Sequence, residues 1–184
     1  MFVSKFGVIN TQLLSNMEMK VRIREYQESD RTAFVKLMEQ LMDYIASIDD
    51  LKRIRRMPEF GESYTQRTLQ KVAEQHGIIY VAEVNGQIVG AAVGTMPEQT
   101  KEDQLEHVPS KFGEVLELVV EAGYRDKSVG TMLMNKLEGY FKENNCNISG
   151  VGVLVANKNA HRVYHKLGYE DRSIYMTKNL HEQK

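Results

Sequence analysis

The pattern of apolar and polar residues predicts alternating strands and helices along most of the chain. Residues 21–24 alternate apolar and charged side chains, which is typical of a half-buried strand. Residues 34–48 carry apolar side chains every three or four positions, so they predict a helix with one buried stripe, for which Ser29 or Asp30 is a suitable N-cap. A second helix is predicted over residues 63–77, ending at a glycine.

Two apolar runs and a polar stretch follow these helices. Residues 78–84 and 87–95 predict two strands, and the Asn85-Gly86 pair between them is typical of a β-hairpin turn. The polar, proline-containing residues 96–112 predict a loop.

The second half of the chain predicts a strand, a helix and a further strand in succession. These cover residues 114–120, 128–143 and 149–155, an order that favours a parallel unit within a mixed sheet. A short helix over residues 159–167 and a last strand over residues 173–177 complete the pattern. The predicted fold is therefore a single α/β (α+β) domain in which helices flank a mixed, mostly antiparallel sheet.

Composition and charge limit the partners of this domain. A chain of 184 residues suffices for one domain, which we place at residues 19–182 behind an N-terminal arm of residues 1–18. The formal net charge of −1 argues against a nucleic-acid surface, which usually needs a basic excess. No apolar run reaches the roughly 18 residues of a membrane helix. A single cysteine, Cys146, excludes an internal disulfide, so a cytoplasmic location is expected.

Residues 123–131 (G-Y-R-D-K-S-V-G-T) connect a buried strand to a helix and are a candidate binding site. The start of a helix exposes unpaired N–H groups and about half a positive charge, and Arg125 and Lys127 add cations beside it. Gly130 lets a ligand approach the backbone closely. These features predict a phosphate or pyrophosphate site, although the Walker A and dinucleotide motifs are both missing. A basic helix start without a ligand is the alternative.

Two motifs in this half resemble those of the GNAT superfamily of N-acetyltransferases. The first is [RQ]-x-x-G-x-[GA] after a strand ending in L-x-V. Residues 118–120 supply L-x-V, and residues 125–130 (R-D-K-S-V-G) supply the signature with Ser128 in place of its first glycine. The second, N-x-x-A-x-x-x-Y, is present at residues 157–164 and is followed by K-L-G-Y. The resemblance runs over residues 21–180 and implies a sheet that splays at the cofactor site.

The resemblance also implies that the protein binds acetyl-CoA as its cosubstrate. The pyrophosphate would bind N–H groups of the loop and helix start, the pantetheine arm would lie along the preceding strand like an added strand, and an asparagine would hydrogen-bond that arm. The residues implied are Leu118, Val119, Val120, Arg125, Asp126, Lys127, Ser128, Val129, Gly130, Thr131 and Asn157.

The serine in the signature has two possible conformations. If the backbone of Ser128 is left-handed, the side chain costs about 1 kcal/mol of strain. If it is helical, serine costs little and can cap the helix. The N–H groups of the loop are preserved in both cases.

Acetyl transfer to an amine needs a base, a donor for the oxyanion and an acid for the leaving thiolate. Glu114 and Glu117 are the candidate bases, and strand parity places them on opposite faces unless a bulge resets the register. A backbone N–H near Val119 or Val120 would stabilise the oxyanion. Tyr164 occupies the position of the family's thiolate-protonating tyrosine. Each of these side chains could instead be structural, as an edge carboxylate, an ion-pair partner or a packed aromatic ring.

A pair of histidines and a run of basic residues are two other candidate binding sites. His161 and His165 are spaced i, i+4, which can hold zinc on a helix. A zincin motif needs glutamate where this chain has Arg162, so no metal site is predicted and the histidines are expected at the surface or beside CoA. The basic run 52–56 is either a solvated face or a contact for the CoA 3′-phosphate or an acidic substrate.

The predicted function is transfer of an acetyl group from acetyl-CoA to a primary amine of a small molecule or protein, by direct attack in a ternary complex. A non-catalytic acyl-CoA sensor of the same fold and a phosphate-binding protein unrelated to CoA are the alternatives. The resemblance implies that the first helices and loops such as 51–61 and 96–112 select the acceptor, and the acidic residues there suit a cationic amine. No nucleic-acid or membrane partner is expected, and family habit implies a homodimer.

Overall fold

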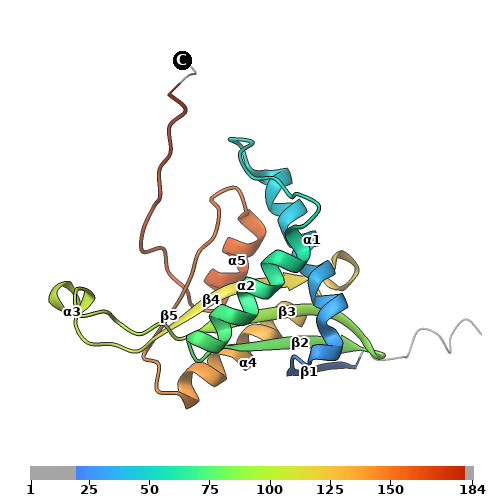
Figure 1. Ribbon diagram of the computed structural model, residues 1–184, viewed down its shortest axis with the longest axis horizontal. Helices are drawn as coiled ribbons and strands as arrows, with labels where there is room; N and C mark the ends of the chain where they lie inside the picture. The colour runs from blue at the N-terminus through green and yellow to red at the C-terminus, as the bar shows by residue number, and fades with distance from the viewer. Residues whose placement is uncertain (1–19, 181–184) are drawn as a thin grey trace, which may run out of the picture.

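The computed structural model describes residues 20–180, which form a five-stranded sheet with helices on both faces (Figure 1). The predicted arm of residues 1–18 lies outside the described residues. The strands are β1 (Val21–Glu25), β2 (Ile78–Val84), β3 (Gln87–Thr95), β4 (Phe112–Val120) and β5 (Ile148–Val151). The helices are α1 (Arg31–Ile48), α2 (Phe60–Glu74), α3 (Asp103–Glu106), α4 (Val129–Glu143) and α5 (Lys158–Lys166), with 3-10 turns η1 (Glu28–Asp30) and η2 (Ala122–Tyr124).

The strands lie in the order β1-β2-β3-β4-β5. The first three neighbouring pairs are antiparallel, whereas β4 and β5 are parallel, as expected for strands joined through a helix. The predicted mixed, mostly antiparallel sheet is therefore confirmed.

The end of the sheet opens after a short parallel pairing. β4 pairs with β5 only from Phe112 opposite Ile148 to Val115 opposite Val151, while the rest of β4 continues to Val120 beside β3 alone. This divergence of β4 and β5 is the splay that the family resemblance implied.

Each face of the sheet carries its own apolar core. On one face, α1 contributes Phe34, Leu37 and Met38, all no more than 1% exposed, and α2 packs beside it. On the other face, α4 buries Leu133 and Leu137 against the sheet. Figure 1 shows α1 and α2 together on one side of the strands and α4 on the other. Among residues 20–180, no helix combines the length and apolar character that a bilayer-spanning segment requires.

Three predictions of local structure need correction. The strand predicted over residues 149–155 ends at Val151, and the predicted loop 96–112 contains the short helix α3. The last strand, predicted over residues 173–177, is wrong because this segment has no strand pairing within residues 20–180. Its apolar side chains are exposed instead, with Tyr175 91% and Met176 85% accessible. Figure 1 shows this segment extending away from the sheet.

Candidate functional site

The backbone at the C-terminal end of β4 offers hydrogen-bonding groups to a ligand. The N–H of Glu121 donates to the carbonyl of Val89 at 2.9 Å, which fixes the alternation of the antiparallel pairing between β3 and β4. By this alternation Val119 bonds to β3, whereas Leu118 and Val120 direct their N–H and C=O groups away from β3. Since β5 has already diverged, those groups lie at an open edge where an extended ligand can pair with them.

The start of α4 lies directly after this open edge. The first helical hydrogen bond runs from the N–H of Met132 to the carbonyl of Ser128 at 2.9 Å. The N–H groups of Val129, Gly130 and Thr131 precede that bond, so they are the ones a helix start leaves for an anion.

Ser128 adopts the strained one of its two expected conformations. Its φ of 62° and ψ of 5° are left-handed, and its side chain makes no capping hydrogen bond. The glycine of the family signature would adopt this backbone freely, whereas a residue with a Cβ does so at a cost. The serine therefore keeps the shape of the loop and introduces local strain.

Packing within the protein does not require a glycine at position 130. A Cβ built on it would contact only Val120 at 3.7 Å and Leu118 at 4.0 Å, which are ordinary van der Waals distances. Its φ is not in the left-handed region, where glycine would be needed. Protein atoms thus leave room for a methyl group beside Gly130, and a loop that admits a phosphate needs such room.

The two predicted cations are held by the loop itself. The Nε of Arg125 donates to the carbonyl of Val120 at 3.0 Å, and its guanidinium lies 5.3 Å from the centre of the Tyr44 ring. The ammonium of Lys127 donates to the carbonyl of Gly123 at 2.9 Å. Both charges stay within the loop, but neither side chain is directed by these contacts onto the start of α4. Asp126, between them, is exposed and left-handed, with a φ of 59°.

Asn157 lies at the start of α5, on the far side of the splay. Its Oδ1 accepts from the N–H of Ala160 at 3.2 Å and from the hydroxyl of Tyr44 at 3.3 Å. These bonds occupy the carbonyl oxygen, so the Nδ2 amide is the group that can reach a ligand. Tyr44 of α1 contacts both Arg125 and Asn157, and therefore bridges the loops that follow β4 and β5.

A β-bulge in β4 brings the two candidate glutamates to the same face of the sheet. Val93 pairs with Glu117 and Gly94 with Val115, so Leu116 is an extra residue on β4. The simple parity expectation, which placed the glutamates on opposite faces, therefore fails, and the bulge exception applies. Both side chains contact α2: Glu114 accepts from the ammonium of Lys71 at 3.0 Å, and Glu117 accepts from the hydroxyl of Tyr64.

Glu117 and Tyr164 both have perturbed acidities. Burial raises the pKa of Glu117, and the Tyr64 hydroxyl and the Lys71 charge offset part of that shift. Burial also raises the pKa of Tyr164 to about 12, helped by Tyr169 and by the charge of Glu117. Glu117 is thus close enough to Tyr164 to influence it electrostatically. Carboxylate and phenol with shifted pKa values in one place are typical of proton-transfer sites.

Tyr164 is buried in the core on the α4 face of the sheet. The residue is 7% exposed and its ring meets that of Tyr169 edge-on, with 5.8 Å between the centroids. It comes from α5, whereas Glu117 faces α2, so the two groups approach the open edge of β4 from opposite faces of the sheet.

The structure also contains a cavity of about 1290 Å³ at some distance from this site. It lies between the C-terminal ends of α2 and α4 and the β3–β4 loop, with Val72, Lys111 and Asn144 among its lining residues. None of the predicted cofactor-binding or catalytic residues lines it, so it is a separate feature.

Sequence motifs did not identify Tyr44, Tyr64 and Lys71 as part of the site. All three lie on α1 or α2, for which the sequence predicts helices but no individual site residue. One signal was present for α2, because Tyr64 and Lys71 are two helical turns apart and so share a face.

Comparisons with known proteins show the family of this chain. The profile of the Acetyltransferase (GNAT) family matches residues 36–169. An uncharacterized N-acetyltransferase of Methanocaldococcus jannaschii is 34% identical over 96 residues, which cover 52% of this chain and 54% of that protein, so the chain spans about half the length of this relative.

Solved structures share the fold at low sequence identity. A mutant of the BH1408 protein from Bacillus halodurans superposes with a TM-score of 0.76 at 19% identity, covering 86% of this chain and 99% of that one. A predicted acetyltransferase from Clostridium acetobutylicum, crystallised with acetyl-CoA, gives a TM-score of 0.65 at 20% identity, covering 88% and 97%. The match of the family profile to most of the chain shows that the protein belongs to the GNAT family of acetyltransferases.

Proposed function

We propose that the protein transfers an acetyl group from acetyl-CoA to a primary amine by direct attack in a ternary complex. One observation carries this proposal: the open edge of β4 leads directly into the unpaired N–H groups of α4, with Glu117 and Tyr164 beside that edge. An extended arm that ends in a diphosphate fits such a surface. The structural neighbour from Clostridium acetobutylicum, which contains acetyl-CoA, also supports it.

The proposed binding residues would contact different parts of acetyl-CoA. Leu118 would hydrogen-bond the pantetheine arm through its backbone, Val120 would bind the thioester through its N–H, Val119 would support the strand through its buried side chain, and Asn157 would donate from Nδ2. The N–H groups of residues 125–131 would surround the pyrophosphate, with those of Val129, Gly130 and Thr131 placed for it by the helix start.

Glu117 is the better candidate for the base. Glu114 lies where β4 is paired on both edges, opposite Gly150 of β5, and its carboxylate forms an ion pair with Lys71. Glu117 lies beyond that pairing, beside the open edge, and its pKa is raised. Because an alkylammonium has a pKa near 10.4, it must lose a proton before it can attack, and a carboxylate of raised pKa accepts that proton more readily.

Tyr164 would supply the proton that the leaving sulfur needs. Acetyl-CoA provides the acetyl group as an activated thioester. The Tyr164 hydroxyl stays protonated at neutral pH because its pKa is about 12. It can donate that proton to the departing thiolate and recover one from the acetylated nitrogen as the amide forms. The N–H of Val120, which faces the open edge, would stabilise the oxyanion.

Release of free CoA in the presence of an amine panel tests this function. Glu117→Gln and Tyr164→Phe should each lower kcat by about 10²- to 10⁴-fold, the usual contribution of one proton-transfer group. The matched control Glu143→Gln lies at the far end of α4 and should leave kcat unchanged. Binding of acetyl-CoA without turnover of any amine would favour the sensor, and no binding at all would favour a different phosphate ligand.

The acceptor is proposed to be cationic, because loops 51–61 and 96–112 carry acidic side chains. Asp49 is excluded from this role because its carboxylate accepts from the backbone N–H groups of Arg53 and Ile54, which hold its pKa below the ordinary value. Asp103 likewise accepts from Thr100. Exposed acidic side chains elsewhere in these loops, such as Glu59 and Glu102, remain for an ammonium group.

A homodimer is also proposed. The exposed side chains of Ile174, Tyr175 and Met176 and the lack of a described strand beyond β5 support it, because apolar extended segments and free strand edges favour pairing with a second copy. Size-exclusion chromatography coupled to light scattering measures the molar mass in solution. A purely monomeric species would refute the proposed homodimer.

A further inference from the structure

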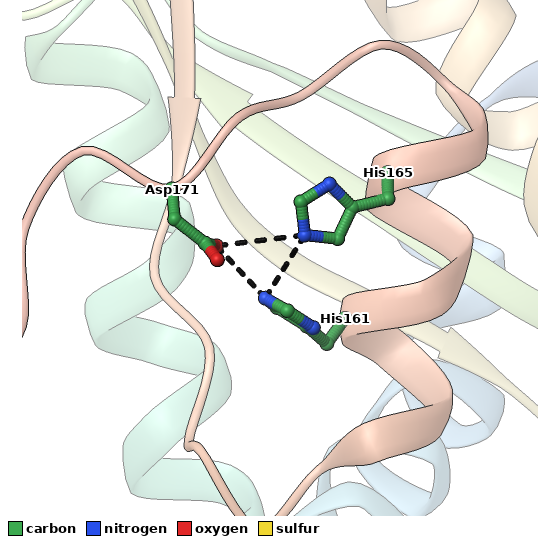
Figure 2. Close-up of side chains that lie close together, drawn as sticks. All are labelled: His161, His165 and Asp171. Carbon is green, nitrogen blue, oxygen red and sulfur yellow. Dashed lines mark hydrogen bonds and ion pairs between the residues drawn. The ribbon is translucent and has the colours of Figure 1, made fainter.

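Three metal-binding side chains converge at the end of α5. His161 and His165 project from successive turns of the helix, and Asp171 reaches them from the segment that follows it (Figure 2). One ligand atom of each residue lies within 4.8 Å of the other two. The imidazole rings meet edge-on, with 4.4 Å between their centroids.

The spacing of these atoms fits a tetrahedral zinc ion. Zinc bonds of about 2.0–2.1 Å place neighbouring ligand atoms about 3.3 Å apart in tetrahedral geometry. Here the two Nε2 atoms are 3.2 Å apart, and the Oδ1 of Asp171 lies 2.8 Å from His161 and 3.6 Å from His165. The three atoms therefore form a triangle whose sides are within about 0.5 Å of those of one face of the tetrahedron.

Hydrogen bonds between neutral imidazoles satisfy this arrangement only if the Nε2 of His161 shares one proton between Asp171 and His165. The Nε2 of His161 lies within bonding distance of both the Asp171 carboxylate and the Nε2 of His165. If it carries a proton for Asp171, it cannot accept from His165, and if it accepts from His165, it faces the carboxylate as a second acceptor. A divalent cation within reach of all three atoms would bind each lone pair at once.

We infer that His161, His165 and Asp171 bind a zinc ion, with water completing the coordination. Two imidazoles and a carboxylate favour zinc over magnesium or calcium, which prefer oxygen donors. This site revises the expectation of no metal, which rested on the absent zincin glutamate and had no signal for Asp171. The side chains are 37%, 45% and 66% exposed, so the ion can enter from solvent, and affinity should be below that of closed four-ligand sites.

Zinc at this position would tie the segment after α5 back onto the helix. The tied residues include Tyr169, whose ring packs on Tyr164, so the metal would stabilise the part of the core that holds Tyr164. The role is structural, and its test needs no enzymatic activity.

Calorimetric titration of the chelator-treated full chain with zinc chloride tests the site. One ion per chain is expected, with His161→Gln, His165→Gln and Asp171→Asn each weakening binding at least tenfold. His107→Gln, which changes an exposed loop histidine outside the cluster, is the matched control and should bind as the wild type does. Zinc at 100 times its Kd should raise the Tm by about 5 to 10 °C, and magnesium should not compete.

Each contrary outcome overturns the inference in its own way. Undiminished binding by Asp171→Asn would mean that an ordinary pair of helical histidines chelates the ion. Undiminished binding by the double variant His161→Gln/His165→Gln would place the ion elsewhere. Failure of the wild type to bind zinc at millimolar concentration would remove the site altogether.

Discussion

Replacing Ser128 by glycine should stabilise the protein, because this residue holds a left-handed backbone at the start of α4. A non-glycine residue in this conformation costs about 1–2 kcal/mol. Glycine removes that strain but adds about 0.4–1 kcal/mol of entropy to the unfolded chain. The net gain in the free energy of unfolding is then about 0.5–1 kcal/mol, or about 1–4 °C in Tm for a domain of this size.

Thermal and urea unfolding of the Ser128 variants measure this gain. Ser128→Ala is the matched control: it keeps the Cβ and loses only a hydroxyl that makes no capping bond, so it should lie within about 0.5 kcal/mol of the wild type. Ser128→Val should be destabilised, since β-branched residues tolerate positive φ poorly. Affinity for acetyl-CoA should change less than about threefold in Ser128→Gly, because the N–H groups stay in place. A glycine variant less stable than the alanine variant would refute the reasoning.

Three further predictions address the base, the anion site and the fold. Tyr64→Phe removes the hydroxyl that lowers the pKa of Glu117, so the acid limb of kcat/KM should move to higher pH, and an unmoved limb would exclude Glu117 as the base. Gly130→Val should leave Tm nearly unchanged but weaken acetyl-CoA binding at least tenfold in calorimetry, and wild-type affinity would place the diphosphate elsewhere. Asp30→Asn breaks a two-bonded ion pair with Arg24 and should cost about 2 kcal/mol in urea unfolding. Because Arg24 holds the pKa of Asp30 below 3.8, that stabilisation is present above pH 3.8 and is lost as the pH falls through the folded pKa, whereas the asparagine variant should lack this acid dependence.

Periodicity predicted most of the fold because each face of the sheet buries a regular apolar stripe. The hairpin at Asn85-Gly86 and the helix beginning at Val129 follow directly from local patterns. The last strand was predicted wrongly because the apolar alternation around Ile174 and Met176 would be the same in a paired strand and in an exposed segment. Pairing depends on a partner edge, which a local pattern does not specify.

The geometry of the candidate site was predictable where it depends on motifs and not where it depends on strand register. Residues 125–131 form the predicted loop and helix start, and the splay leaves the predicted edge of β4 open. The bulge at Leu116 was beyond prediction because it arises from how β3 and β4 align, and it decides which face Glu117 occupies. Tyr44 and Tyr64 reach the site only through the packing of α1 and α2 on the sheet.

The central claim is that backbone N–H groups at the start of α4 bind the diphosphate of acetyl-CoA. Titration of ¹⁵N-labelled protein with acetyl-CoA, followed by amide NMR, tests it most directly, with S-acetylpantetheine as the comparison that lacks the diphosphate. The account predicts that the amides of Val129, Gly130 and Thr131 shift strongly with acetyl-CoA and little with the truncated thioester. Unchanged amides at these three positions under saturating acetyl-CoA would contradict it.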